Sequence, residues 1–225
     1  MQTVRRIAIY DMDRTITVRG TYTAFLVHMA RAIAPWRLIF LPLAGLVMLA
    51  YVLRLITRGR AKELNQALLM GRRVSRARIL PAVETFADKV VAGNVRPGAL
   101  ARIAQDRADG CQLVIASASY RLYVEPIARR LGFDHVIATD HFTQGVDYVR
   151  ARIAGENCYD VAKLRMIESW MAAQGIARDA AHVRAYSDHV TDAPMLGYAD
   201  EGYAANPHEP LRKLAAERGW PILHW

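Results

Sequence analysis

The stretch Ile7-Ala8-Ile9-Tyr10-Asp11-Met12-Asp13-Arg14-Thr15 decides the fold. Its apolar part, which begins at Val4, stops abruptly at two carboxylates one residue apart and then a hydroxyl. Such a run is typical of a strand in a parallel sheet, which is covered on both faces and needs no polar alternation. Open α/β sheets bind ligands at the carboxyl ends of their strands, so Asp11 and Asp13 are candidate site residues. The same pattern is also compatible with a solvated turn or a helix N-cap.

The length and charge of the chain set broad limits. Its 225 residues suffice for one large domain, or for a core domain with an insertion. Thirty Lys and Arg against 21 Asp and Glu give a net charge of +9. This balance fits a nucleic-acid binder, a protein resting on anionic lipid, an enzyme for acidic substrates, or simply a solvated basic surface.

Cysteine usage and the N-terminal residues bear on the compartment. Cys111 and Cys158 lack the spacing of metal ligands, and Arg5 and Arg6 run straight into the first strand with no apolar signal segment. We therefore expect a reducing, cytoplasmic environment without a disulfide framework.

After residue 94, apolar runs alternate with helical patterns. Strands are expected at 112–116, 135–138, 183–186, 201–204 and 222–225, helices at 98–108, 120–131, 160–174 and 210–218, and a small hairpin at 142–153 around Gly145. Strands that alternate with helices over this length indicate parallel βαβ units. The sequence thus predicts a doubly wound, Rossmann-like α/β core with a parallel sheet.

Residues 17–93 have helical spacing and predict an all-helical cap, inserted into a core domain of residues 1–16 and 94–225. Within this cap, residues 36–56 are strongly apolar and residues 38–53 carry no charge. Three alternatives are open: a buried helix or helical hairpin, an interfacial helix that docks on a membrane, or a spanning helix. A single crossing would separate Asp11 from every later candidate residue. The basic flank from Arg54 to Lys62 fits anionic headgroups or a solvated helix end.

Polar side chains follow two further predicted strands. Ser117-Ala118-Ser119 follows the strand at 112–116, Ser187 to Asp192 follows the strand at 183–186, and Lys163 lies in the first turns of the helix between them. Each feature alone has a structural explanation, as a helix N-cap, a solvated lysine, or an acidic pair that suits a helix dipole. Such features at several strand ends together indicate one site.

In order along the chain, Asp11-Met12-Asp13-Arg14-Thr15, Ser117, Lys163, and Asp188 with Asp192 resemble the four motifs of the haloacid dehalogenase-like phosphatase superfamily. More narrowly, the chain resembles the phosphoserine-phosphatase-like branch, subfamily IB, which has a helical cap between the first two motifs. The supporting phrases are Pro97-Gly98, Gly155-Glu156-Asn157-Cys158 and Asn206-Pro207. The cap is also similar to bacterial phosphatidylglycerophosphate phosphatases of that branch, in Arg31, Pro35, Leu41-Pro42-Leu43 and Gly59-Arg60-Ala61.

The resemblance implies a Mg²⁺-dependent phosphomonoester hydrolase that forms an aspartyl-phosphate. It implies that Asp11 is the nucleophile and a metal ligand, and that Asp13 gives its main-chain carbonyl to Mg²⁺ and its carboxyl group as general acid and base. The remaining implied roles are a steadying contact from Thr15, phosphoryl binding by Ser117 and Lys163, metal ligation by Asp188, and ligation or orientation by Asp192.

Three positions depart from the family pattern: Arg14 and Ser187 stand where Gly is usual, and His189 where Ser or Asn is frequent. His189 is interpreted as a polar loop residue, with contact to substrate or water as the alternative. Expected partners are a phosphorylated small molecule or lipid, no nucleic acid, and the inner face of a membrane through residues 36–62. Alternatives are a phosphotransferase on the same scaffold, or a membrane-docking or partner-binding module with a vestigial site; the oligomeric state stays open.

Overall fold

The computed structural model describes residues 4–144 and 147–225. The strands in these residues are β1 (Arg5–Tyr10), β2 (Arg73–Ser75), β3 (Gln112–Tyr120), β4 (His135–Gln144), β5 (Tyr148–Ala154), β6 (Ala181–Ser187), β7 (Glu201–Ala205) and β8 (Ile222–Leu223). The helices are α1 (Tyr22–Ile33), α2 (Leu41–Val52), α3 (Arg58–Leu69), α4 (Arg76–Gly93), α5 (Pro97–Ala108), α6 (Arg121–Leu131), α7 (Val161–Ala173), α8 (Ala193–Tyr198) and α9 (Glu209–Arg218). Short helical turns are η1 (Met12–Ile16), η2 (Pro35–Phe40), η3 (Arg178–Ala180) and η4 (Val190–Asp192).

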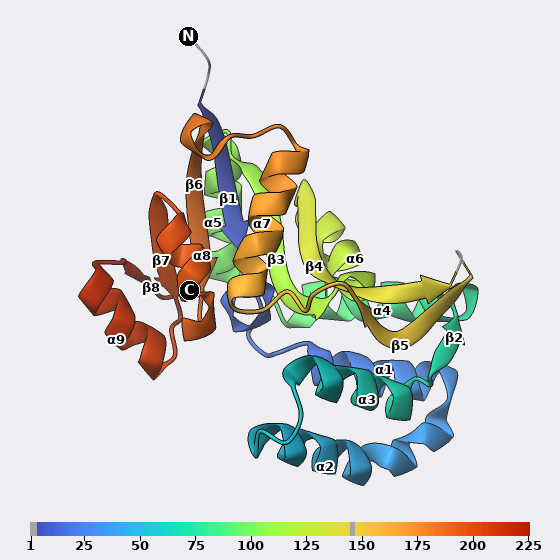
Figure 1. Cartoon of the computed structure of the whole chain (residues 1–225). Helices are drawn as coiled ribbons and strands as arrows, with labels where there is room; N and C mark the ends of the chain where they lie inside the picture. The colour runs from blue at the N-terminus through green and yellow to red at the C-terminus, as the bar shows by residue number, and fades with distance from the viewer. Residues whose placement is uncertain (1–3, 145–146) are drawn as a thin grey trace.

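The strands form one 8-stranded sheet in the order β2-β5-β4-β3-β1-β6-β7-β8. From β4 to β8 all neighbours are parallel, and β1 lies in the middle, paired with β3 on one side and β6 on the other. Helices cover both faces, with α7 and α8 on one face and α5 and α6 on the other (Figure 1). The predicted doubly wound α/β fold is therefore confirmed.

The two faces of β1 explain why its buried part, Ile7 to Tyr10, is apolar. Ile7 and Ile9 pack into the core that α7, α8 and α9 cover. Ala8 and Tyr10 point the other way, into the core beneath α5 and α6. Because side chains alternate across a strand, a strand covered on both faces needs apolar residues at every position.

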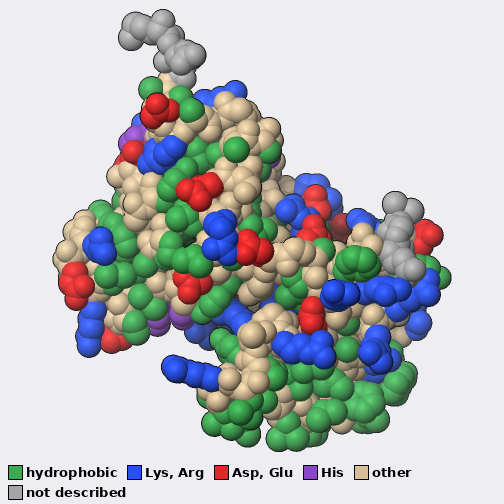
Figure 2. All heavy atoms as spheres, viewed as in Figure 1, with side chains coloured by type: hydrophobic (Ala, Val, Ile, Leu, Met, Phe, Trp, Pro, Cys, Tyr) green, Lys and Arg blue, Asp and Glu red, His purple; other side chains and the backbone are tan. Residues whose placement is uncertain are grey.

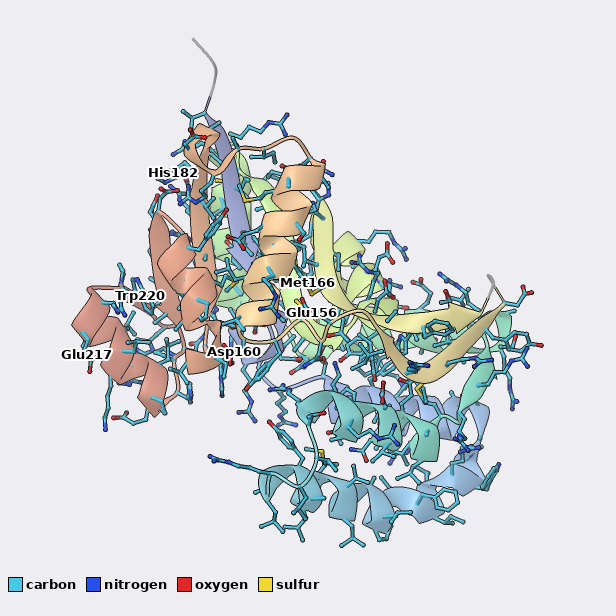
Figure 3. The ribbon with its side chains drawn as sticks, viewed as in Figure 1. Glu156, Asp160, Met166, His182, Glu217 and Trp220 are labelled. Atoms are coloured by element: carbon cyan, nitrogen blue, oxygen red, sulfur yellow. The ribbon has the colours of Figure 1, made fainter. Side chains whose placement is uncertain are left out.

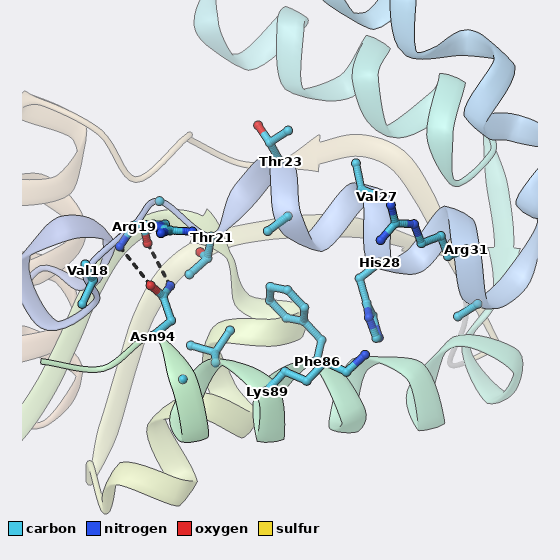
Figure 4. Close-up of a pocket in the computed structure, with 15 residues that line it drawn as sticks. Val18, Arg19, Thr21, Thr23, Val27, His28, Arg31, Phe86, Lys89 and Asn94 are labelled. Carbon is cyan, nitrogen blue, oxygen red and sulfur yellow. Dashed lines mark hydrogen bonds between the residues drawn. The ribbon is translucent and has the colours of Figure 1, made fainter.

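Helices α1, α3 and α2 form a layer beyond the carboxyl end of the parallel strands, with α2 farthest from the sheet (Figure 1). The two chain segments that lead into and out of residues 17–93 run side by side. Thr17 and Val95 form an antiparallel bridge, and the Asn94 side chain exchanges two hydrogen bonds of 3.0 Å with the main chain of Arg19 (Figure 4). This contact supports boundaries near residues 17 and 93, which stay a prediction.

Two local expectations need correction. Residues 17–93 are not entirely helical, because β2 pairs antiparallel with β5 at the sheet edge, with Val74 buried opposite Val149. The strand expected at 135–138 continues to Gln144 and pairs antiparallel with β5. β2 was not predicted because a strand of only three residues is too short to show a hydrophobic periodicity. The expected hairpin centre, Gly145, lies outside the described residues.

The apolar segment 36–56 does not form a buried helix. Its stretch Pro35–Val52 is long and apolar enough to cross a membrane by length and composition, but only 6% of it is buried. Ala44 is the buried residue of α2. A single crossing would place β1 and β3 on opposite sides of a bilayer, whereas these strands pair in one sheet. The buried helix and the single crossing therefore do not fit this arrangement; the segment lies on the protein surface, and its docking on a membrane stays a prediction.

Candidate active site

Three chain segments meet at the carboxyl end of the central strands. Asp11 directly follows β1, and its N–H donates to the Tyr186 carbonyl at 2.9 Å, which extends the pairing with β6. Asp188 directly follows β6. Helix α7 begins next to them: Asp160, just before its first residue, lies at the end of α7 that faces the layer of α1 and α3 (Figure 3). Lys163, in the first turn of α7, therefore reaches the same edge.

Lys163 is the centre of the charge cluster. Its ammonium group donates to Asp11 Oδ1 at 2.8 Å and to Asp192 Oδ2 at 2.7 Å, and the side chain is only 2% exposed. Burial alone would lower the pKa of Lys163, but the carboxylates of Asp11 and Asp192 outweigh it and raise the pKa. Lys163 is therefore positively charged over the whole physiological pH range.

Thr15 connects the first and last motifs. Its hydroxyl oxygen lies 3.2 Å from Asp11 Oδ2 and 3.3 Å from Asp188 Oδ1, and it accepts a 2.9 Å hydrogen bond from the N–H of Asp188. The Trp225 indole N–H donates to the Thr15 carbonyl at 2.9 Å and steadies the same turn. Two carboxylates that are 177 positions apart in the sequence, from 11 to 188, thus face one hydroxyl group.

The carboxylates carry more negative charge than Lys163 alone offsets. Burial raises the pKa of Asp11 to about 8. Attraction by Lys163 opposes this shift, and repulsion by Asp192 and Asp188 adds to it. Burial and Asp192 raise the pKa of Asp188 to about 6, against the Thr15 hydrogen bond. A cation beside these two groups would stabilise their ionised forms.

The donor set fits a hard divalent cation. In residues 4–144 and 147–225, no group of three or more His, Cys, Asp or Glu side chains is arranged around a metal position. Two carboxylates, Asp11 and Asp188, do converge on Thr15, and oxygen donors of this kind are the ligands that Mg²⁺ would accept, together with waters. The unbalanced negative charge of this pair is the feature that favours a cation.

The carboxylate of Asp13 is turned away from this pair. Its Oδ1 accepts hydrogen bonds from the Thr21 N–H at 2.6 Å and the Thr21 hydroxyl at 2.7 Å, and its Oδ2 accepts one from Ser119 at 2.6 Å. Thr21 immediately precedes α1, so Asp13 links the first motif to the helical layer. Hydrogen bonds from Thr21 and Ser119 therefore hold the Asp13 side chain, whereas Lys163 holds that of Asp11.

A cavity of about 420 Å³ opens over the cluster. Ser117 lines it and is 1% exposed; its Oγ accepts from the Ser119 N–H at 3.1 Å, which leaves the hydroxyl hydrogen free to donate. The charged side chains that line the cavity, together with His189, are Asp11, Asp13, Arg14, Arg58, Lys163, Asp188 and Asp192. The structure thus brings acids, one buried lysine and a hydroxyl donor to one open space.

The three departures from the family pattern have structural explanations. Arg14 has φ +64°, a left-handed conformation that favours Gly and costs an L-residue about 1–2 kcal/mol. Ser187 donates its hydroxyl to Asp192 Oδ2 at 2.7 Å, a contact that Gly could not make. His189 caps η4 by accepting from the Thr191 N–H, stacks on His208 at 4.1 Å, and also lines the cavity.

Three residues at this site were not predicted as site residues: Thr21, Ser119 and Arg58. Thr21 and Ser119 bind Asp13, and Arg58 reaches the cavity from the start of α3, where its guanidinium lies 4.0 Å from the Tyr159 ring centroid. Their roles depend on how α1 and α3 pack on the sheet edge. The sequence signals were the basic flank that contains Arg58 and the phrase Ser117-Ala118-Ser119, which places Ser119 at the end of a strand.

A larger cavity lies elsewhere. It measures about 940 Å³ and lies between α1 and α4, where Val27, His28, Phe86 and Lys89 line it (Figure 4). None of its lining residues is acidic, and none belongs to the cluster around Lys163. The size of a cavity alone therefore does not identify the active site.

Comparison with known proteins agrees with this arrangement. The family model of haloacid dehalogenase-like hydrolases matches residues 8–197. A probable phosphatase of Mycobacterium tuberculosis is 38% identical over 124 residues, which cover 54% of this chain and 41% of that protein. Phosphoserine phosphatase SerB1 of the same organism is 32% identical over 170 residues, 74% of this chain and 52% of that protein. A crystal structure of a Bordetella pertussis Tohama I protein of unknown function superposes with a TM-score of 0.87 at 28% identity, over 98% of this chain and 99% of that one.

The chain belongs to the haloacid dehalogenase-like hydrolase superfamily, and its similarity to phosphoserine phosphatase SerB1 supports the phosphoserine-phosphatase-like branch. This confirms the resemblance found in the motifs. The chain spans about 41% of the length of the first of these relatives and about half of the second.

Proposed function

We propose that this chain is a Mg²⁺-dependent phosphatase that hydrolyses a small or lipid-linked phosphate monoester through an aspartyl-phosphate on Asp11. The observation that carries the proposal is the buried ammonium of Lys163, bound to Asp11 and Asp192 beside Asp188 and under an open cavity. The relatives named phosphatases support the same class of reaction.

Asp11 is the proposed nucleophile because its carboxylate lines the cavity and is oriented by two different groups. Lys163 holds Oδ1 and Thr15 lies next to Oδ2. One carboxylate oxygen attacks phosphorus while the bond from phosphorus to the ester oxygen breaks. The positive charge of Lys163 offsets the approach of two anions and favours the ionised carboxylate.

Asp13 is the proposed proton shuttle. In the first step it donates a proton to the departing alkoxide; in the second it removes a proton from the water that attacks the phosphoryl group. Release of inorganic phosphate then regenerates the Asp11 carboxylate. The hydrogen bonds from Thr21 and Ser119 keep the Asp13 carboxyl group oriented through both steps.

The transferred phosphoryl group needs donors on its own oxygens. Ser117 accepts a hydrogen bond from the Ser119 N–H and keeps its hydroxyl hydrogen for the phosphoryl group, and Lys163 carries a fixed positive charge next to the nucleophile. Preorganised donors of this kind contribute several kcal/mol to transition-state stabilisation, about 3–4 kcal/mol each. Loss of either is expected to reduce kcat more than it weakens binding.

Asp11, Asp188 and the main-chain carbonyl of Asp13 would hold Mg²⁺, and Asp192 would orient the site through Lys163 and Ser187. When bound, the ion supplies charge neutralisation between the attacking carboxylate and the phosphate. The buried, mutually repelling carboxylates of Asp11 and Asp188 support this assignment.

The test is a phosphatase screen with phosphoserine, nucleotides, sugar phosphates and phosphatidylglycerophosphate. Activity is expected with Mg²⁺, is lost in chelator, and returns when Mg²⁺ is restored. Asp11→Asn is expected to lower turnover by at least about 10⁴-fold. Parent and Asp11→Asn proteins that are equally inert across the panel would favour a binding module with a vestigial site, and phosphoryl transfer to added alcohols faster than to water would favour a phosphotransferase.

A further inference from the structure

The helix farthest from the active-site edge, α2, and the turns on either side of it carry large apolar side chains that are exposed. Ile39, Val52 and Leu55 are 69%, 69% and 73% exposed. The complete set of exposed large apolar residues here is Trp36, Ile39, Leu41, Leu43, Leu46, Met48, Leu49, Val52, Leu53 and Leu55. Figure 2 shows them as a continuous hydrophobic surface over α2. We call this set the α2 face. Contiguous apolar surfaces of this kind mark interaction sites.

The charge around the α2 face is of one sign. No Asp or Glu occurs from residue 14 to residue 62. The same stretch contains eight cationic residues: Arg14, Arg19, Arg31, Arg37, Arg54, Arg58, Arg60 and Lys62. Arg31 and Arg54 flank the η2–α2 segment and are exposed. A surface that combines apolar side chains with flanking cations is complementary to a bilayer with anionic headgroups.

A second copy of the chain is the poorer occupant. Pairing two α2 faces would bring Arg31 and Arg54 of one copy towards the same cations of the other, with no acidic residue in the segment to offset them. A lipid surface adapts its shape to a helix that is apolar all round, and its phosphates supply the missing negative charge.

The α2 face is connected to the active site. A cavity of about 220 Å³ runs between α2, α3 and the sheet edge. Its lining includes Met48 and Tyr51 of α2, Arg58 and Lys62 of α3, and Asp13 and Ser119 of the active-site edge. The helix that carries the apolar surface therefore also forms a wall of the space next to the proposed proton shuttle.

We propose that the α2 face docks the protein on an anionic membrane surface, and that the phosphate monoester is presented to Asp11 from that surface. The substrate part of this inference rests on the proposed function, whereas the docking part does not. Docking places the apolar portion of the substrate along Met48 and Tyr51 and its phosphate towards Arg58 and Asp13.

The experiment is co-sedimentation of the full chain with vesicles of phosphatidylcholine, with and without phosphatidylglycerol. The docking variant is Leu46→Gln/Leu49→Gln/Val52→Gln, and the charge variant is Arg54→Gln. The matched control, Val4→Gln/Leu80→Gln/Leu100→Gln, removes three exposed apolar side chains from other surfaces. None of these residues lies in the site, so all variants should hydrolyse a soluble ester such as p-nitrophenyl phosphate like the parent.

The parent and the control are expected to sediment with phosphatidylglycerol vesicles. The docking variant should bind at least about tenfold more weakly. The charge variant should bind about fivefold more weakly. Docking is overturned if the parent stays in the supernatant, if the docking variant binds as well as the parent, or if the parent is a dimer that ignores vesicles and the docking variant makes it a monomer.

Failure of the proposed function would look different. An inert parent protein that still binds vesicles through the α2 face would leave docking intact and remove the phosphatase. A parent that binds vesicles and hydrolyses soluble esters, but not a phosphate monoester lipid in those vesicles, would overturn the substrate part of the inference.

Discussion

Helices α1 and α3 lie between two regions of opposite character: one buries charged side chains, and the other exposes apolar side chains. On the sheet side, Asp11, Lys163, Asp188 and Asp192 are all less than 8% exposed, yet each of them is ionisable and partnered. On the other side, hydrophobic side chains gather on the surface over α2 (Figure 2), where Leu46, Leu49 and Val52 are more than half exposed. Buried charges and exposed hydrophobic groups both cost stability. Because both features reduce stability, we infer that each serves a function. Substitutions in the two regions should therefore have different effects.

After Asp11→Asn, the largest effect is expected from Asp13→Asn. Loss of the proton shuttle should reduce steady-state hydrolysis of an alkyl phosphate by about 10²–10⁴-fold. With p-nitrophenyl phosphate the leaving group needs no proton, so the first step should survive and the second should stall. Rapid-mixing kinetics should then show a burst of p-nitrophenolate, about one per active site. A uniform loss with both esters and no burst would contradict the assigned role.

The next largest effect is expected from Lys163→Met, which leaves two carboxylates buried without their cation. Turnover should fall by about 10²–10³-fold. The free energy of unfolding should fall by about 3 kcal/mol, because breaking a buried ion pair leaves charge uncompensated. Denaturant titration and initial rates measure both quantities. Lys89→Met, at an exposed lysine of α4, is the control and should change neither. Equal behaviour of the two variants would remove the contrast between buried and surface charge.

A smaller effect concerns His141 of β4, which lies where the sheet meets α3. Its ring stacks on Tyr120 at 3.8 Å, and its Nε2–H donates to Gln66 of α3 at 2.8 Å. Burial, with a contribution from Lys62, lowers the pKa of His141 to about 3. Between pH 6.5 and 3 the unfolded chain therefore binds a proton that the folded chain does not, so this residue makes stability fall as the pH falls.

At pH 5 this linkage costs about 2 kcal/mol relative to pH 7. His141→Gln removes the titration, so the stability of the parent minus that of the variant should shrink by about that amount between pH 7 and pH 5. Urea titrations at both pH values measure it. The raised pKa values of Asp11 and Asp188 make stability rise as the pH falls. Both residues are present in the parent and in the variant, so their contributions cancel in the difference. A pH-independent difference would contradict the buried, neutral imidazole.

The smallest effect is expected in the α2 face. Leu46→Gln/Leu49→Gln/Val52→Gln should change the free energy of unfolding in solution by less than about 1 kcal/mol, since surface substitutions away from special features are nearly neutral. Thermal unfolding without lipid measures it. If the free energy of unfolding fell by several kcal/mol, these side chains would be covered in the folded protein. The contrast between buried charges and exposed apolar groups would then not hold.

The sequence predicts the core because the central strands carry apolar runs, such as Ile7 to Tyr10 in β1 and Leu113 to Ala116 in β3. The strand expected at 183–186 is observed as Ala181–Ser187, and Asp188 follows it as expected. The same information cannot distinguish a buried from an exposed apolar helix, because residues 36–56 have the same composition in both cases. Thr21 and Ser119 are equally hidden from sequence reasoning, since their contacts with Asp13 exist only once α1 packs against the end of β3.

The most direct test of the account is to identify the residue that carries phosphate during turnover. The protein is mixed with a phosphate ester and Mg²⁺, quenched in acid within the first turnover, and mapped by peptide mass spectrometry. We predict phosphate on Asp11, and none in the Asp11→Asn protein. Turnover with phosphate on another residue, or with undiminished activity of Asp11→Asn, would contradict it.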